Sequence, residues 1–248
     1  MPNSFLFVRS ADRQLGTSSA FRVTLPQNYQ HVTAVTMLSC ELPFSFYNVD
    51  APYTSGVTFV HNGVSFAYAV PAGFYIITDL TSALLAALQS AFPSAGVTSV
   101  TYSALTGLIS ITYTSGLVFS AQADASGLLG RLLGTDPTGL ATLASGGVLT
   151  LPAVAMLAPT STLFMRIGEL PSQTASTNNQ QAFARLQLSG APGSIVLANA
   201  AASVFNTNVF SVPVATLNTL TVSLYTQDGT PANLHGVEWT FTLLLTTA

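Results

Sequence analysis

A two-residue alternation of apolar and polar side chains limits what this chain can form. Over residues 217–225, Leu220, Val222 and Leu224 alternate with threonine and serine, and residues 237–245 place an apolar side chain at every second position. Because successive side chains of a β-strand point to opposite faces, this period predicts strands with one buried face and one outward face. The C-terminal part of the chain is therefore expected to be β-structure.

The same alternation predicts strands along most of the chain. They are expected over residues 20–26, 32–42, 57–60, 64–71, 97–102, 108–114, 163–170 and 194–198. Asn62 and Gly63 tolerate the positive φ angles of a tight turn and predict a hairpin between two of these strands. Residues 32–42 are apolar on both faces, which indicates a strand that is covered on both sides.

One convincing helix interrupts the strand pattern. Residues 79–92 carry leucines at four-residue spacing, with Thr78 placed to cap the first turn and Pro93 placed to end the helix. A shorter helix or turn is expected over residues 126–133, with Gly134 as its stop signal.

The number and irregular spacing of the strands, without a visible repeat, indicate the fold class. We expect an all-β protein: an antiparallel jelly-roll β-sandwich with one or two short helices in insertions. Residues 1–19 are expected to form an N-terminal arm and residues 20–248 a single jelly-roll domain, with a loop-rich insertion around residues 115–181.

The chain is unusually poor in charge. Charged residues make up 6% of it, and there is no lysine, whereas soluble domains carry about 25% charged residues. Such a chain either spans a membrane or covers its surface with other subunits. Residues 148–165, the best uncharged window, contain two prolines and four threonine or serine residues, so we expect no membrane-spanning helix.

Two observations bear on the membrane alternative and on the cellular compartment of the chain. An outer-membrane barrel remains an alternative because its strands show the same alternation, although residues 1–7 lack the basic start and the apolar run of an export signal. Cys40 is the only cysteine, so no disulfide forms within the chain, and we interpret it as a small core residue in a reducing compartment.

Little in the sequence indicates chemistry. His31, His61 and His235 lie far apart, and the last two fall in predicted turns, where we interpret them as solvated loop residues. Asp12 and Arg13 are expected to form a local ion pair, and Glu169 could pair with an arginine on a neighbouring strand. We predict no catalytic residue, no metal, no cofactor and no enzymatic activity.

The arginines are spread along the sequence, so no basic stripe is expected and direct binding of nucleic acid is not predicted. They are Arg9, Arg13, Arg22, Arg131, Arg166 and Arg185.

Five short segments follow one another in a recognisable order. They are residues 9–13 (RSADR), 41–49 (ELPFSFYNV), 71–75 (PAGFY), 224–231 (LYTQDGTP) and 234–243 (LHGVEWTFTL). This series resembles the penton and minor capsid proteins of large eukaryotic DNA viruses, virophages and polinton-like viruses. The same segments also have packing roles: Pro43 cannot donate to a strand ladder, and the aromatic residues after it can close one end of a sandwich.

The resemblance implies a single jelly roll that assembles as a pentamer at the five-fold vertices of an icosahedral capsid. It further implies contacts with the major capsid protein and with other minor capsid proteins, and a location in the virion after assembly in the host cell. Asp12 and Arg13 are the interface residues that we infer from it. A minor capsid protein between or beneath the capsomers, and a carbohydrate-binding jelly-roll module, remain as alternatives.

Overall fold

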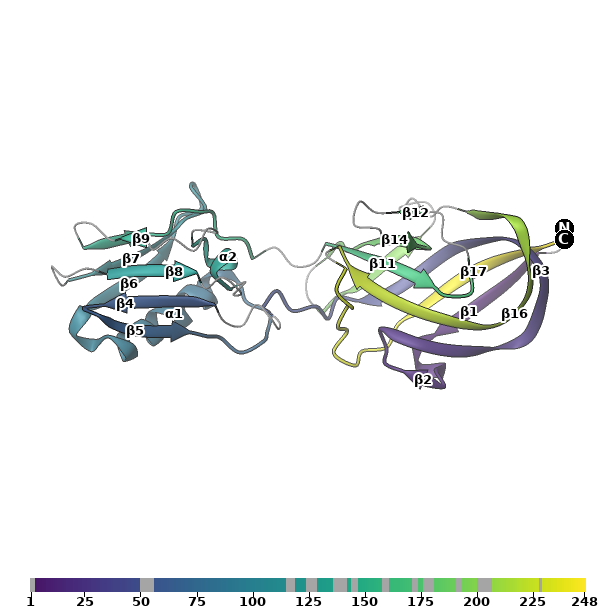
Figure 1. Cartoon of the computed structure of the whole chain (residues 1–248), viewed down its shortest axis with the longest axis horizontal. Coiled ribbons are helices and arrows are strands. Elements are labelled where there is room, and N and C mark those ends of the chain that lie inside the picture. The colour runs from purple at the N-terminus through teal and green to yellow at the C-terminus, as the bar shows by residue number, and fades with distance from the viewer. Residues whose placement is uncertain are drawn as a thin grey trace. The chain divides into compact units, whose positions relative to one another are not determined.

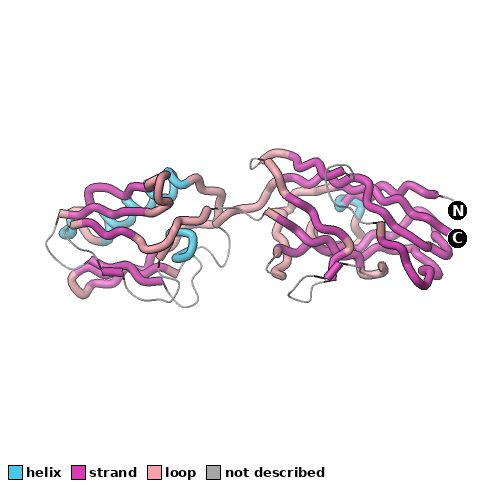
Figure 2. Tube along the Cα trace, turned by 90° about the horizontal axis from the view of Figure 1, so that it is seen from above, coloured by secondary structure: helices cyan, strands magenta, loops and turns pink. Residues whose placement is uncertain are grey.

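The structure is a computed structural model in which strands predominate and the few helices are short or lie in one region (Figure 2). It describes residues 3–49, 56–114, 119–123, 129–135, 142–143, 147–157, 161–170, 174–175, 181–190, 193–199, 207–227 and 229–248. The chain divides into two compact units: unit 1 comprises Met1–Phe46 and Thr160–Ala248, and unit 2 comprises Tyr47–Pro159. None of the helices in the described part of the chain is long and apolar enough to cross a membrane.

Unit 1 contains an eight-stranded curled sheet with the order β1-β17-β3-β16-β11-β14, in which β2 and β15 also pair with β3. Its elements are β1 (Asn3–Arg9), the 3-10 helix η1 (Ser10–Asp12), β2 (Leu15–Gly16), β3 (Ala20–Pro43), β11 (Thr162–Ile167), β12 (Thr174–Ala175), β13 (Gln181–Ala182), β14 (Ala184–Gln187), β15 (Ile195–Asn199), β16 (Asn208–Thr226) and β17 (Thr240–Thr247).

Two long strands turn this curled sheet into a sandwich. β3 and β16 pair antiparallel over most of their length and bend together from one layer into the other (Figure 1). The first part of β3 and the last part of β16 lie in one layer with β2, β11 and β14. The last part of β3 and the first part of β16 lie in the other layer with β1, β15 and β17. The result is the predicted antiparallel jelly roll.

The core of unit 1 lies between the two layers. Trp239 is buried there, with its ring stacked on Phe241 at a centroid distance of 5.1 Å and edge-on to Phe21 at 6.0 Å. Leu220, Val222 and Leu224 are buried as the C-terminal alternation predicted.

Two β-bulges explain why residues 32–42 are apolar on both faces. The register between β17 and β3 skips Thr33 and Leu38. Each extra residue shifts the in-and-out alternation by one position. The residues that are buried along this stretch are Val32, Val35, Met37, Cys40 and Leu42. The prediction of a strand covered on both sides is therefore wrong, since one face carries the whole buried set.

The N-terminal segment also differs from expectation. Residues 1–19 were expected to form an arm, but β1 pairs with β17 from Asn3, opposite Thr246, to Arg9, opposite Thr240. Leu6 and Val8 are buried beneath this pairing. The segment belongs to the sheet because it contributes apolar side chains to the core.

Unit 2 has its own sheets and its own helices. Its elements are β4 (Val57–His61), β5 (Val64–Tyr68), α1 (Ile77–Ala91), the 3-10 helix η2 (Pro93–Ala95), β6 (Val97–Tyr102), β7 (Ile109–Tyr113), β8 (Phe119–Ala123), α2 (Leu129–Leu133), β9 (Thr142–Leu143) and β10 (Val148–Thr150). One sheet has the order β5-β4-β8-β9 and the other β10-β7-β6. The predicted hairpins are confirmed, the first with positive φ angles at Asn62 (51°) and Gly63 (78°).

Helix α1 buries its leucine stripe in the core of unit 2. Leu80, Leu84 and Leu88 have no exposed surface, as the four-residue spacing predicted. The start of the helix differs from the prediction: Ile76 occupies the N-cap position without a side-chain bond. Thr78 is not the cap but lies within the first turn, where its carbonyl accepts hydrogen bonds from the hydroxyl groups of neighbouring residues.

The chain was predicted to form a single domain over residues 20–248, but it forms two units. The inserted unit begins at Tyr47, far ahead of the expected insertion at residues 115–181, part of which lies outside the described residues. The physical reason is that the buried residues of units 1 and 2 form two separate hydrophobic clusters. The helix and both predicted hairpins serve the second cluster.

Because the two clusters share no residue, we expect Leu84→Ala to destabilise unit 2 selectively, by about 2–5 kcal/mol. Trp239 is the only tryptophan and lies in unit 1, so its fluorescence reports the unfolding of that unit. Calorimetry of Leu84→Ala should show an early transition while the fluorescence midpoint in denaturant stays unchanged.

The matched control is Leu220→Ala, an equally buried leucine in unit 1, which should move the fluorescence midpoint. An equal shift of that midpoint in both variants would show that the two units unfold as one.

Candidate interaction surfaces

The jelly roll of unit 1 presents two outward sheet surfaces, because each layer buries only its inner face. We define them by the residues that point outward from neighbouring strands. The two surfaces differ in charge and in apolar content, and they are the candidate functional surfaces of this unit.

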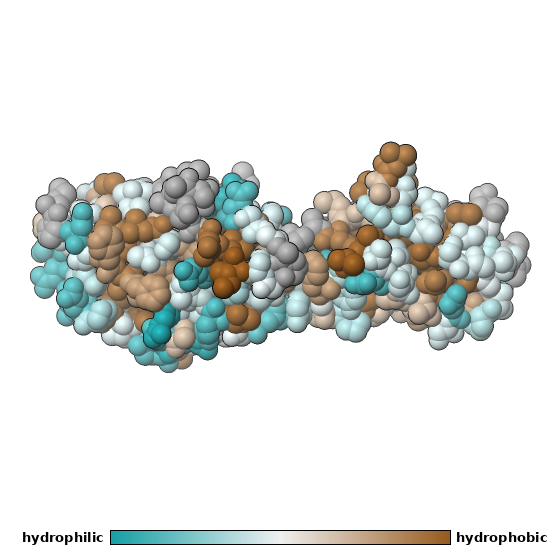
Figure 3. All heavy atoms as spheres, turned by 180° about the vertical axis from the view of Figure 1, so that it is seen from behind, coloured by the Kyte–Doolittle hydropathy of each residue, from teal (hydrophilic) through white to brown (hydrophobic). Residues whose placement is uncertain are grey.

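The first surface, the apolar face, lies on β1, β3, β15, β17 and the start of β16. Its defining residues are Phe5, Phe7, Ile195, Leu197 and Val209, with exposed fractions of 72%, 62%, 66%, 67% and 60%. Threonine and serine side chains of β17 and β3 lie between them in register. The view from behind shows apolar side chains gathered on the unit 1 surface (Figure 3).

Charge is scarce on the apolar face. Arg9 lies at its margin and is paired with Asp12 at 2.7 Å. Glu41, opposite Leu197 in the sheet, is exposed and accepts only a long hydrogen bond from Thr240, at 3.3 Å. Among the described residues it has no ion pair, so the face carries one uncompensated negative charge.

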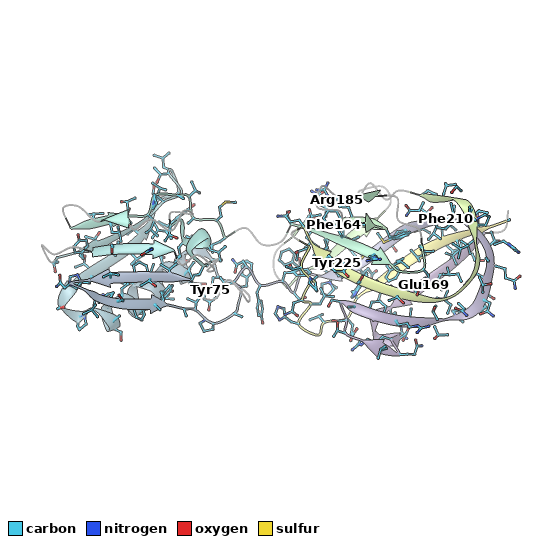
Figure 4. All side chains as sticks on the ribbon, in the orientation of Figure 1. Tyr75, Phe164, Glu169, Arg185, Phe210 and Tyr225 are labelled. Atoms are coloured by element: carbon cyan, nitrogen blue, oxygen red, sulfur yellow. The ribbon has the colours of Figure 1, made fainter. Side chains whose placement is uncertain are left out.

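The second surface, the arginine face, lies on β3, β11, β14 and β16. Its defining residues are Arg22, Phe164, Arg166, Arg185 and Tyr225. Phe164 is opposite Arg185 on one side and Tyr225 on the other, and Figure 4 shows these three side by side on neighbouring strands. Strand spacings of about 4.8 Å bring residues that are distant in sequence into one patch.

The three arginines of this face are exposed, and within the described part of the chain none of them has a carboxylate within 4.0 Å. Glu169 is the nearest described acid along the strand, but it does not pair with an arginine. Its two carboxylate oxygens accept hydrogen bonds from the backbone N–H and the hydroxyl of Thr221, both at 2.7 Å. The expected pairing of Glu169 with an arginine is therefore wrong.

Asp12 and Arg13 lie beside a group of hydrogen bonds that joins the end of β1 to the residues just before β17. They do not pair with each other as expected: Asp12 pairs with Arg9, and Arg13 pairs with Glu238 at 2.6 Å. The backbone N–H of Ser10 donates to the carbonyl of Trp239 at 2.9 Å.

The hydroxyl of Ser10 completes this group, which we call the Ser10–Glu238 cluster. It accepts a hydrogen bond from the backbone N–H of Trp239 at 2.9 Å and donates one to Glu238. The hydrogen bond from Ser10 and, next to it, the hydrogen bond from the Arg13 guanidinium lower the pKa of the Glu238 carboxyl. Ionised Glu238 therefore helps to hold the segment after β1 against the segment before β17.

The cysteine and two of the histidines differ in their burial. Cys40 is buried, and desolvation raises the pKa of its thiol to about 12, which agrees with its interpretation as a core residue. His235 is exposed, but His61 is buried with its ring 5.8 Å from that of Phe92, so its interpretation as a solvated residue is wrong. His61 follows the buried alternation of β4, and this spacing could have revealed it.

No group of three or more histidine, cysteine, aspartate or glutamate side chains in the described residues is arranged to hold a metal ion.

Comparisons with known proteins identify the fold. No protein-family description and no curated protein matches this sequence. The structure matches the crystal structure of the mavirus penton protein over 100% of both chains, with a TM-score of 0.53 and 12% sequence identity. The chain has the fold of this penton protein. The match covers both units, so the resemblance first noted in short segments is confirmed for the fold.

The Ser10–Glu238 cluster makes a pH-dependent prediction. Since the pKa of Glu238 is lowered in the folded state, its ionised form stabilises unit 1 above the ordinary glutamate pKa of about 4.3, and the contribution disappears as the pH falls through the lowered pKa. Glu238→Gln should lower the denaturation midpoint at pH 7, read by Trp239 fluorescence. The difference should shrink as the pH falls below about 4.3 and vanish at an acid pH below the lowered pKa.

Asp79→Asn, on the helix of unit 2, serves as the control and should leave the fluorescence midpoint unchanged at both pH values. A pH-independent loss in Glu238→Gln would mean that packing, not the ionised carboxylate, stabilises the cluster.

Proposed function

We propose that this chain is a structural capsid protein, the penton that occupies the five-fold vertices of an icosahedral virion as a pentamer. The observation that carries the proposal is the match of its whole length to the fold of a penton protein. A jelly roll alone serves many functions. The inserted unit 2 makes the match more specific, because it is included in the alignment of both complete chains.

The charge distribution supports a protein that is covered by neighbours. Charged residues make up 6% of the chain, and the apolar face exposes two phenylalanines and three aliphatic side chains on one sheet. Exposed apolar patches of this kind mark surfaces that contact other proteins. The major capsid protein and other minor capsid proteins are the partners that we propose beside further copies of the chain.

A reconstruction of the assembled particle tests the vertex position. We expect density for five copies of this chain at every five-fold vertex, and particles made without the chain should lack that density while retaining the rest of the shell. Density between or beneath the capsomers, with three-fold or no symmetry, would instead assign the chain as another kind of minor capsid protein.

Asp12 and Arg13 remain our proposed contacts to neighbouring subunits. Because Arg13 forms an ion pair with Glu238 inside unit 1, Arg13→Glu alone would bring two carboxylates together and weaken the fold. The exchange Arg13→Glu with Glu238→Arg restores an opposite-charge pair but reverses the charge that each position offers outward.

The double exchange and Glu238→Gln both lose the carboxylate to which Ser10 donates a hydrogen bond, so we expect them to have similar denaturation midpoints. Only the double exchange should reduce incorporation into particles several-fold. Particle content is measured by quantitative mass spectrometry and stability by Trp239 fluorescence. Equal incorporation of the two variants would remove Arg13 from the interface, and a midpoint of the double exchange well below that of Glu238→Gln would make the role of Arg13 structural.

A further inference from the structure

A closed ring requires each copy to use two different surfaces. Rotation about a five-fold axis brings one patch of a subunit against another patch of the next, so the contact is heterologous. A heterologous contact needs two unlike surfaces, and the two outward faces of unit 1 differ in this way. One is apolar and carries Glu41, and the other is aromatic and carries three arginines; among the described residues none of these four side chains has an ion pair.

We propose that the apolar face of one copy packs against the arginine face of the next copy. This inference rests on the proposed function, because only a ring of copies demands two unlike surfaces. It goes beyond that function by naming the surfaces and the residues that meet.

Charge complementarity favours this pairing over the alternatives between copies. Two arginine faces in contact would bring six guanidinium groups together, and like charges across an interface oppose association. Two apolar faces in contact would bring two Glu41 carboxylates into one interface and leave all the arginines uncompensated. Only the mixed contact brings Arg166 or Arg185 toward Glu41.

The side-chain chemistry of the two faces also fits. Arginine is always charged but weakly hydrated, and its planar group stacks on aromatic rings, so it suits contact with Phe5 and Phe7. The hydroxyl of Thr242, which lies opposite Phe7 in the sheet, offers an acceptor for a further guanidinium N–H group. Phe164 and Tyr225 supply the apolar area on the opposing side, since aromatic residues and arginine are enriched where proteins meet.

Two double variants test the two faces one at a time. Arg166→Glu with Arg185→Glu reverses the charge of the arginine face, and Phe7→Asp with Leu197→Asp places acidic groups on the apolar face. Arg166, Arg185, Phe7 and Leu197 are all exposed, so both variants should fold with nearly unchanged Trp239 fluorescence midpoints. Leu105→Asp, at a residue of unit 2 that is 96% exposed, is the matched control.

Native mass spectrometry of the purified full chain reads the assembly state. We expect rings from the unchanged chain and from Leu105→Asp, and monomers from each face variant alone. When the two face variants are mixed, the intact apolar face of the first fits the intact arginine face of the second. The mixture should therefore give one-to-one dimers and no closed ring.

Several outcomes would overturn the inference. Rings that survive both face variants would place the contact elsewhere, and a mixture that stays monomeric would show that the two faces do not meet. An unchanged chain that remains monomeric at its highest soluble concentration would also overturn it. So would binding of single-stranded DNA that requires Arg166 and Arg185, because it would assign the arginine face to nucleic acid.

A failure of the proposed function can be distinguished from a failure of this inference. It would appear in the particle reconstruction as a chain absent from the five-fold vertices, whatever the mixing experiment shows. A chain present at the vertices whose rings survive both face variants would overturn the inference alone.

Discussion

The pairing of β3 with β16 is the interaction on which the architecture of unit 1 depends. The two strands run antiparallel from Ala20, opposite Ser223, to Val35, opposite Asn208, with register shifts where they bend. Bulges increase local twist and let a strand change direction without losing its partner. A single curled sheet thereby becomes two layers, which enclose the buried Trp239 and leave two outward faces.

The same closure determines how the few charges are used. Arg9 and Arg13 neutralise acids close to the N-terminal strand, while Glu169 fixes β16 through Thr221. The other arginines of unit 1 are left on one sheet face without an acid beside them among the described residues. The described arginines of unit 1 that lack an ion pair thus lie where the surface is also aromatic, a combination that suits contact with another protein.

Unit 2 shows why strand patterns alone do not define a domain. Its hairpins, its helix and the leucine stripe of α1 followed from local spacing, since turn geometry and a four-residue period are properties of short segments. That they form a core of their own follows from which apolar faces meet in space. A core boundary at Tyr47 has no local signature, because the surrounding residues continue the same apolar and aromatic composition.

The sequence by itself determined the β-class, most strand positions, the helix and the scarcity of charge, because each depends on residue type and on spacing within one element. Only the tertiary structure decided the rest. The bulges at Thr33 and Leu38 shift which residues of β3 point into the core, so that all the buried residues lie on one face. β1 joins the sheet by pairing with β17, more than 200 residues away in sequence. Arg22, Arg166 and Arg185 are distant in sequence and become one surface because four strands, β3, β16, β11 and β14, lie side by side, which local sequence does not encode.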